Sequence, residues 1–148
     1  MCEENKLKYN QYKKENDECL KLFKMDLENA KLAEKTISKH MDNVEMFLNE
    51  YLLSEDPDPM QKGARMLHKY FGGYYIYEYL FATPGTVKTT AASIKKFYKS
   101  MLDHEKITKD DFDYLVLDIK QNMEDWMKMC EEFNHPDDDD PYYLDQFF

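Results

Sequence analysis

The sequence has few of the residues that interrupt helices and none of the long apolar runs that cross membranes. Its 148 residues include only four glycines and five prolines, a composition that favours long helices over many tight turns. No apolar run approaches the roughly 20 residues of a membrane span, and the first residues contain no signal-peptide hydrophobic segment. We therefore expect a cytoplasmic protein that does not enter a membrane.

Cysteine and histidine are too sparse and too scattered to indicate a disulfide framework or a metal site. The three cysteines lie far apart and form no C-x-x-C pair. The four histidines are separated by 28 or more residues, so a metal site would require convergence that no local spacing indicates. Glycine-rich phosphate loops, the G-x-S-x-G elbow and the H-E-x-x-H motif are all missing. We expect no metal, no cofactor and none of the common catalytic activities.

Hydrophobic residues are plentiful, and the charge along the chain is uneven. Hydrophobic residues make up 43% of the chain and aromatic residues 15%, enough for the core of one domain. The net charge is −10, a poor starting point for a nucleic-acid binder. Residues 60–109, however, carry a net charge of +6, whereas residues 110–148 carry −11 and end in a run that includes Asp137 to Asp140. The basic segment therefore lies within an acidic protein.

Apolar residues recur every three or four positions in five segments, which predicts an all-α fold, a single bundle of about five helices. The expected helices span residues 16–33, 36–52, 60–81, 86–102 and 108–133. The expected organisation is a flexible N-terminus at 1–15, a helical domain at 16–134 and an acidic, aromatic tail at 135–148.

The third expected helix is the least regular of the five. Gly72 and Gly73 interrupt its apolar pattern, and the alternation of Tyr75, Tyr77 and Tyr79 also suits a strand. Helix is favoured, because the chain holds no second strand-like segment with which an isolated strand could pair. These tyrosines are expected mainly in the core, although an exposed Tyr75 or Tyr79 would be able to stack on bases or on a partner.

The fourth expected helix carries the most informative surface. Its lysines form a stripe beside the apolar face, with Lys88, Lys95 and Lys99 seven and four residues apart and Lys96 further round. Threonines at its start place hydroxyls and backbone N–H groups at the positive end of the helix, where a phosphate can bind. The alternative is a solvated lysine face in which Thr86 serves only as an N-cap.

Two segments resemble the N-terminal core-binding, SAM-like domain of tyrosine recombinases and phage integrases. Thr36-Ile37-Ser38-Lys39-His40, followed by Val44 and Phe47-Leu48, resembles a family helix with the pattern threonine, hydrophobic residue, tyrosine, hydrophobic residue, phenylalanine. Thr86 to Thr90, followed by Ser93-Ile94-Lys95-Lys96-Phe97-Tyr98 and Met101-Leu102, resembles the later helix with its leucine, phenylalanine, tyrosine and leucine core. The resemblance covers about Leu20 to Ile107.

The sequence also departs from this family in several places. His40 replaces the usual tyrosine, and the linker that contains Pro57 and Pro59 is unusually long. The acidic fifth helix and the tail are not part of the family pattern. A complete recombinase needs a separate catalytic domain with arginines, lysine, histidine and tyrosine, and this chain has one arginine, Arg65. We therefore expect no recombinase activity.

The resemblance implies a small helical bundle that holds one side of duplex DNA through its second and fourth helices. By position it nominates as DNA contacts Lys35, Ser38, Lys39, Lys88, Thr89, Thr90, Lys95, Lys96 and Lys99. The implied function is a stand-alone, non-catalytic DNA-binding domain connected with DNA recombination.

A protein-interaction or self-association module is the alternative to DNA binding. Its docking surface would be the tyrosine-rich third helix, or Trp126 together with Tyr142-Tyr143-Leu144 and Phe147-Phe148, and its partner a second copy or another protein. A third possibility combines the two functions. The tail would fold over the basic helix and compete with DNA for it, because the two oppositely charged segments are adjacent in the sequence.

Overall fold

The computed structural model describes residues 2–135, and residue 1 and the acidic segment 136–148 lie outside the described part. The described part is helical and contains no strand, which confirms the all-α prediction. Of the helices in these residues, none combines the length and apolar character that a membrane span requires. The elements in chain order are α1 (Glu3–Asn29), α2 (Glu34–Glu45), η1 (Met46–Tyr51), α3 (Met60–Gly63), α4 (Leu67–Lys69), η2 (Tyr70–Tyr74), α5 (Tyr75–Glu78), α6 (Pro84–Asp103) and α7 (Lys109–Asn134).

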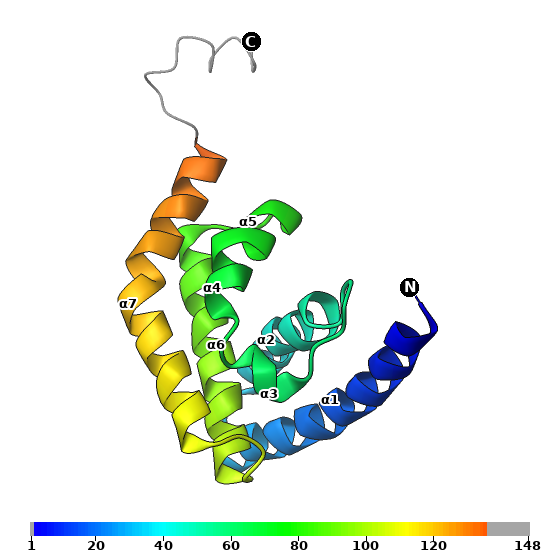
Figure 1. Cartoon of the computed structure of the whole chain (residues 1–148). Coiled ribbons are helices and arrows are strands. Elements are labelled where there is room, and N and C mark those ends of the chain that lie inside the picture. Colours follow the sequence, from blue (N-terminus) through cyan, green and yellow to red (C-terminus); the bar gives the residue numbers. More distant parts are fainter. Residues whose placement is uncertain (1, 136–148) are drawn as a thin grey trace.

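An antiparallel pair of long helices, α6 and α7, forms one side of the molecule (Figure 1). α1 crosses the end of this pair where α6 stops, and there Ser100 of α6 and His104, which follows the helix, both contact the carboxylate of Asp26. α2 packs against α6, while the run from α4 to α5 packs against α7. The core therefore lies between the α6–α7 pair and the shorter elements.

Aromatic rings fill much of this core. The Phe23 ring meets the Phe97 ring edge-on at 5.4 Å, which joins α1 to α6. Phe47 of η1 lies 4.9 Å from Tyr70 of η2. Both of these segments have π-helical hydrogen bonding; for example, Leu52 N donates to Phe47 O at 3.0 Å. The two widened turns therefore meet through their aromatic side chains.

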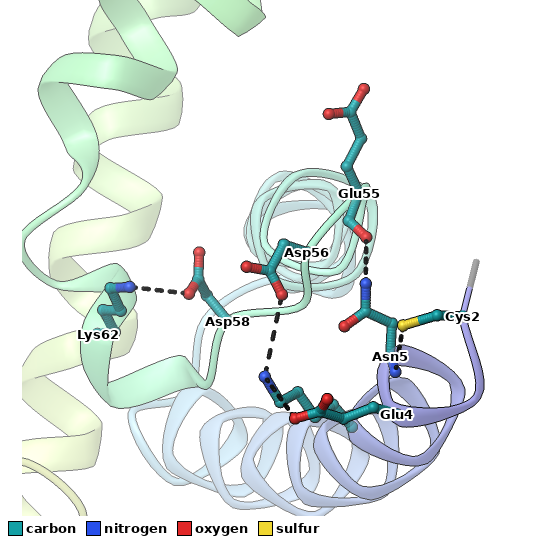
Figure 2. Close-up of polar contacts among 8 residues, drawn as sticks. Cys2, Glu4, Asn5, Glu55, Asp56, Asp58 and Lys62 are labelled. Carbon is teal, nitrogen blue, oxygen red and sulfur yellow. Dashed lines mark hydrogen bonds and ion pairs between the residues drawn. The ribbon is translucent and has the colours of Figure 1, made fainter.

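The first helix begins at Glu3, so the predicted start near residue 16 is wrong. Cys2 caps the helix, since its Sγ accepts from Asn5 N at 3.4 Å. The loop that follows η1 lies over this first part, where Asn5 Nδ2 donates to Glu55 O at 3.5 Å and Lys8 Nζ lies 4.0 Å from Asp56 Oδ1 (Figure 2). Most side chains of these turns are exposed, so no apolar period marks them.

The third helix is broken, although not where the glycine pair predicts. The break follows Gly63, at residues 64–66, whereas Gly72 and Gly73 lie inside the helical run of η2. A Cβ at Gly63 would lie 2.5 Å from Tyr98 Oη and 2.7 Å from Leu52 Cδ1. Close packing therefore explains the glycine at 63, and the alternating tyrosines that follow belong to a helix, not a strand.

Two helix starts are set by capping boxes. At α7, Thr108 Oγ1 accepts from Asp111 N at 3.1 Å, and this confirms the predicted start. α6 begins at Pro84 with Thr83 as its cap, so the predicted start at Thr86 is two residues too late.

Candidate nucleic-acid interface

α6 carries exposed lysines beside a buried apolar face. Thr83 and Thr86 cap its start reciprocally, each hydroxyl accepting from the other's backbone N–H, at 3.1 and 2.8 Å. One face is buried in the core through Val87, Ala91, Ile94, Phe97, Tyr98 and Met101. Outside this face lie four exposed lysines, here called the lysine ridge: Lys88, Lys95, Lys96 and Lys99.

α2, which holds two more of the predicted lysines, packs against α6 at Ser93. Asn43 Nδ2 donates to Ser93 Oγ of α6 at 3.0 Å, and His40 Nδ1 lies 2.8 Å from the same oxygen. Lys35 and Lys39 precede Asn43 at intervals of four residues, so they share its row on the helix surface. Both lysines are exposed. This row therefore meets α6 at Asn43.

Two nominated contacts lie away from the lysine ridge. Ser38 is exposed but lines a groove of about 400 Å³ together with Lys24 and Glu28 of α1. Thr90 is only 4% exposed, and its hydroxyl lies 3.2 Å from the Tyr75 hydroxyl. Burial removes Thr90 from the residues that can reach a ligand. Its position on the apolar face of α6, with Val87, accounts for this burial.

At the start of α6, threonine side chains and backbone groups of the helix itself form many of the available hydrogen bonds. Thr86 N donates to Thr83, and the Thr86 hydroxyl donates to the Thr83 carbonyl at 3.0 Å. The exposed Thr89 donates its hydroxyl to the Thr86 carbonyl at 3.2 Å. The predicted phosphate seat is therefore partly occupied by the helix's own cap, and the lysines are the stronger candidates for anion binding.

The positive charge along the lysine ridge is largely uncompensated. Lys99 is the exception, because its Nζ lies 2.6 Å from Asp103 Oδ1. Among residues 2–135, no carboxylate lies within ion-pair distance of the other three ridge lysines or of Lys35 and Lys39. Burial, and then the charge of Lys96, lower the pKa of His40, which favours the neutral form of this histidine.

The structure contains a groove beside the lysine ridge that no sequence pattern predicts. It has a volume of about 440 Å³ and is lined by Ala92, Lys95, Lys96 and Lys99 of α6 and by Phe112 of α7. Periodicity predicts Phe112 on the core face of its helix, and its ring does lie partly buried at the edge of the core. Antiparallel packing brings Phe112 against α6. This lysine groove thus combines an apolar floor with three cationic side chains.

Exposed apolar side chains gather at a different place, around the loop between α5 and α6. The Tyr77 ring meets the Phe133 ring edge-on at 4.9 Å, and both residues are exposed. Leu80 and Phe81 in the loop are exposed as well. We call these four residues the apolar patch.

Two aromatic residues nominated for docking or stacking belong to the core. Tyr75 is completely buried, and Trp126 is 3% exposed with its ring 5.1 Å from that of Phe71. Tyr79 is partly exposed, but its hydroxyl donates to Glu50 Oε2 at 3.1 Å. The other nominated residues, Tyr142-Tyr143-Leu144 and Phe147-Phe148, lie outside the described residues.

Comparisons with known proteins and a search for metal ligands add no further site. Within the described part of the chain, no three His, Cys, Asp or Glu side chains are grouped to hold a metal ion. No protein-family model matches the chain, and no curated protein or solved structure matches it either. The lysine ridge, the lysine groove and the apolar patch are therefore the candidate functional surfaces of the described residues.

Proposed function

We propose that this chain is a non-catalytic DNA-binding domain related to the core-binding domain of tyrosine recombinases and phage integrases. The single observation that carries the proposal is the lysine ridge together with Lys35 and Lys39 of α2. Ammonium groups bind phosphate oxygens as point charges, and each contact releases counterions from the duplex. Exposed lysines on two packed helices, α2 and α6, also fit the use that the resemblance implies for the second and fourth helices.

The number of lysines without an ion pair sets the expected strength and salt dependence. Contacts from Lys35, Lys39 and three ridge lysines would give a log–log salt slope of about −4.5. Affinity would then fall about 500-fold between roughly 50 and 200 mM salt. Binding that depends on backbone phosphates alone has a Kd of about 10⁻⁴ to 10⁻⁶ M at physiological salt. The proposed activity is therefore weak, tolerant of sequence and strongly dependent on salt.

Fluorescence anisotropy of a labelled duplex with the full chain tests this proposal. The triple variant Lys95→Gln, Lys96→Gln and Lys99→Gln removes most of the ridge charge without touching a buried side chain. Binding should weaken, and the magnitude of the salt slope should fall by about 2 to 3. Equal affinity and equal slope in the variant would refute the assignment of these lysines.

A matched control separates the lysine ridge from net charge. The exposed lysines of α1 and α7 offer a substitution with the same loss of charge: Lys14→Gln, Lys21→Gln and Lys120→Gln. This control should keep the wild-type slope, because none of its lysines borders α6. A control that weakens binding as much as the ridge variant does would indicate general electrostatic attraction instead of a defined interface.

The proposal contains no catalytic step and no cofactor. The single arginine, Arg65, lies 3.0 Å from Asp111 Oδ1, and its guanidinium stacks over the Tyr114 ring at 4.7 Å. It is thus engaged by side chains of α7, and the chain has no second arginine for a phosphoryl transition state. A cytoplasmic setting is part of the proposal and fits three cysteines that are all free.

A protein-interaction module is the second candidate, and the apolar patch favours it. Contiguous exposed apolar side chains often mark a protein interface. Light scattering of the wild type and of Leu80→Asp tests this function. A wild-type dimer that the substitution dissociates, in a protein without DNA affinity, would replace the DNA proposal with self-association.

A further inference from the structure

The described chain ends beside the start of α6, close to one end of the lysine ridge. Asn134, the last residue of α7, donates from Nδ2 to the Ala82 carbonyl at 2.6 Å. Ala82 lies two residues before Pro84, where α6 begins. Residues that follow His135 therefore leave the helical domain near the N-terminal end of α6. The ridge lysine nearest this end of α6 is Lys88.

The segment 136–148 is long enough to follow the whole lysine ridge. Thirteen extended residues span about 43 Å, at about 3.3 Å each. Along α6, at 1.5 Å per residue, Lys99 lies only about 25 Å beyond the level of Ala82. Asp137 to Asp140 can therefore reach Lys88 and the lysines of the next turns, and Tyr142 to Leu144 can reach the lysine groove.

The composition of the segment complements the surface in the same order. After Pro136 come four aspartates and Pro141, and the sequence continues with Tyr142, Tyr143 and Leu144. The surface offers Lys88 first, which has no ion pair with the described residues, and then the lysine groove, where Lys95, Lys96 and Lys99 lie with Ala92 and Phe112. The aspartates thus reach Lys88 and the near lysines of the groove, and the apolar side chains that follow reach Ala92 and Phe112.

We infer that residues 136–148 dock along the lysine ridge of the same chain, with the aspartates on the lysines and Tyr142 to Leu144 in the lysine groove. A segment tethered by a short linker has an effective concentration of about 1 mM. If its intrinsic Kd for the ridge is about 0.1 mM, it lowers the affinity of the ridge for any competing anion about tenfold. The docking itself needs no nucleic acid, whereas its effect on DNA rests on the proposed function.

The test compares the full chain with two variants of equal charge. One carries Asp→Asn at all four positions from 137 to 140. The control removes four exposed carboxylates from α7: Glu124→Gln, Asp125→Asn, Glu131→Gln and Glu132→Gln. For each protein, amide chemical shifts are recorded without DNA, and affinity for a labelled duplex is measured at about 50 mM salt.

Docking predicts that the aspartate variant alone changes the amide shifts of Lys95, Lys99 and Phe112. It also predicts an affinity for DNA about tenfold above wild type, and a smaller increase in the control. Shift changes without DNA binding in any protein would support docking and refute the proposed function. Unchanged ridge shifts with equal DNA affinity in wild type and aspartate variant would overturn docking and leave the proposed function intact. Shift differences that grow with protein concentration would overturn intramolecular docking in favour of a second copy.

Discussion

Gly63 offers the sharpest test of the packing that holds α6 in place. It ends α3, and a Cβ added there would lie 2.5 Å from Tyr98 Oη, 2.7 Å from Leu52 Cδ1 and 3.1 Å from Phe47 Cε1. All three of these side chains are almost fully buried. The Tyr98 hydroxyl cannot move freely, because it donates to the Met60 carbonyl at 2.7 Å. Gly63→Ala must therefore displace the core.

The expected cost follows from these contacts. Overpacking of a dense core costs about 1 to 3 kcal/mol, and loss of the buried hydrogen bond from Tyr98 to Met60 costs about 1 to 3 kcal/mol more. Alanine recovers up to about 1 kcal/mol of helix propensity. We expect Gly63→Ala to lower the free energy of unfolding by about 2 to 4 kcal/mol.

Urea denaturation followed by the fluorescence of the single tryptophan, Trp126, measures this change. Gly73→Ala is the matched control, because a Cβ there meets no atom within 4 Å. The control should raise stability by up to about 1 kcal/mol. In a double-mutant cycle, Tyr98→Phe should make Gly63→Ala about 1 kcal/mol less costly, since the closest atom is gone. A cost below about 0.5 kcal/mol, or additive effects in the cycle, would refute this account of the packing.

Three further substitutions probe polar groups, each by urea denaturation. Burial raises the pKa of Asp118, so the native protein loses stability as pH rises through that raised value. Asp118→Asn should therefore raise the free energy of unfolding by about 1 kcal/mol at pH 7 and lose this advantage near pH 3. A variant that is less stable than wild type at pH 7 would contradict this prediction. Burial and Lys96 lower the pKa of His40, so stability falls as pH drops below about 6.5. His40→Gln should reduce this dependence of stability on pH. The same pH dependence in the variant and in wild type would contradict the prediction. Thr83→Ala removes the α6 cap and should cost about 1 kcal/mol, whereas no loss would show that the cap contributes little.

Sequence patterns predict what depends on neighbours within one helix. The apolar spacing places Lys88, Lys95 and Lys99 in a stripe beside the buried face of α6, and in the structure these lysines are exposed while that face is buried. Thr108 and Asp111 indicate the start of α7, because a capping box needs only residues three positions apart. The same reasoning could have found the burial of Thr90, which shares the face of Val87 and Ile94.

Features that depend on contacts between elements are not predicted. The start of α1 at Glu3 has no apolar period, since those turns are mostly exposed. The break after Gly63 requires knowledge of Tyr98 and Leu52, which come from other elements. The lysine groove arises because antiparallel packing brings Phe112 of α7 against α6. No periodicity within a single helix contains this information.

A net charge of −10 does not by itself exclude binding of a polyanion to the lysine ridge. At physiological ionic strength the Debye length is about 8 Å, so exposed carboxylates further than this from a lysine have little effect on its contact with a phosphate. Their effect is on the approach of DNA, which is a long-range process and is slowed by net repulsion. A carboxylate that reaches the ridge acts differently, because it forms an ion pair with a lysine, as Asp103 does with Lys99. That lysine is then less available to a phosphate. Control of this surface therefore depends on where acidic residues lie and not on how many the chain contains, which makes Asp137 to Asp140 the residues best placed to exert it.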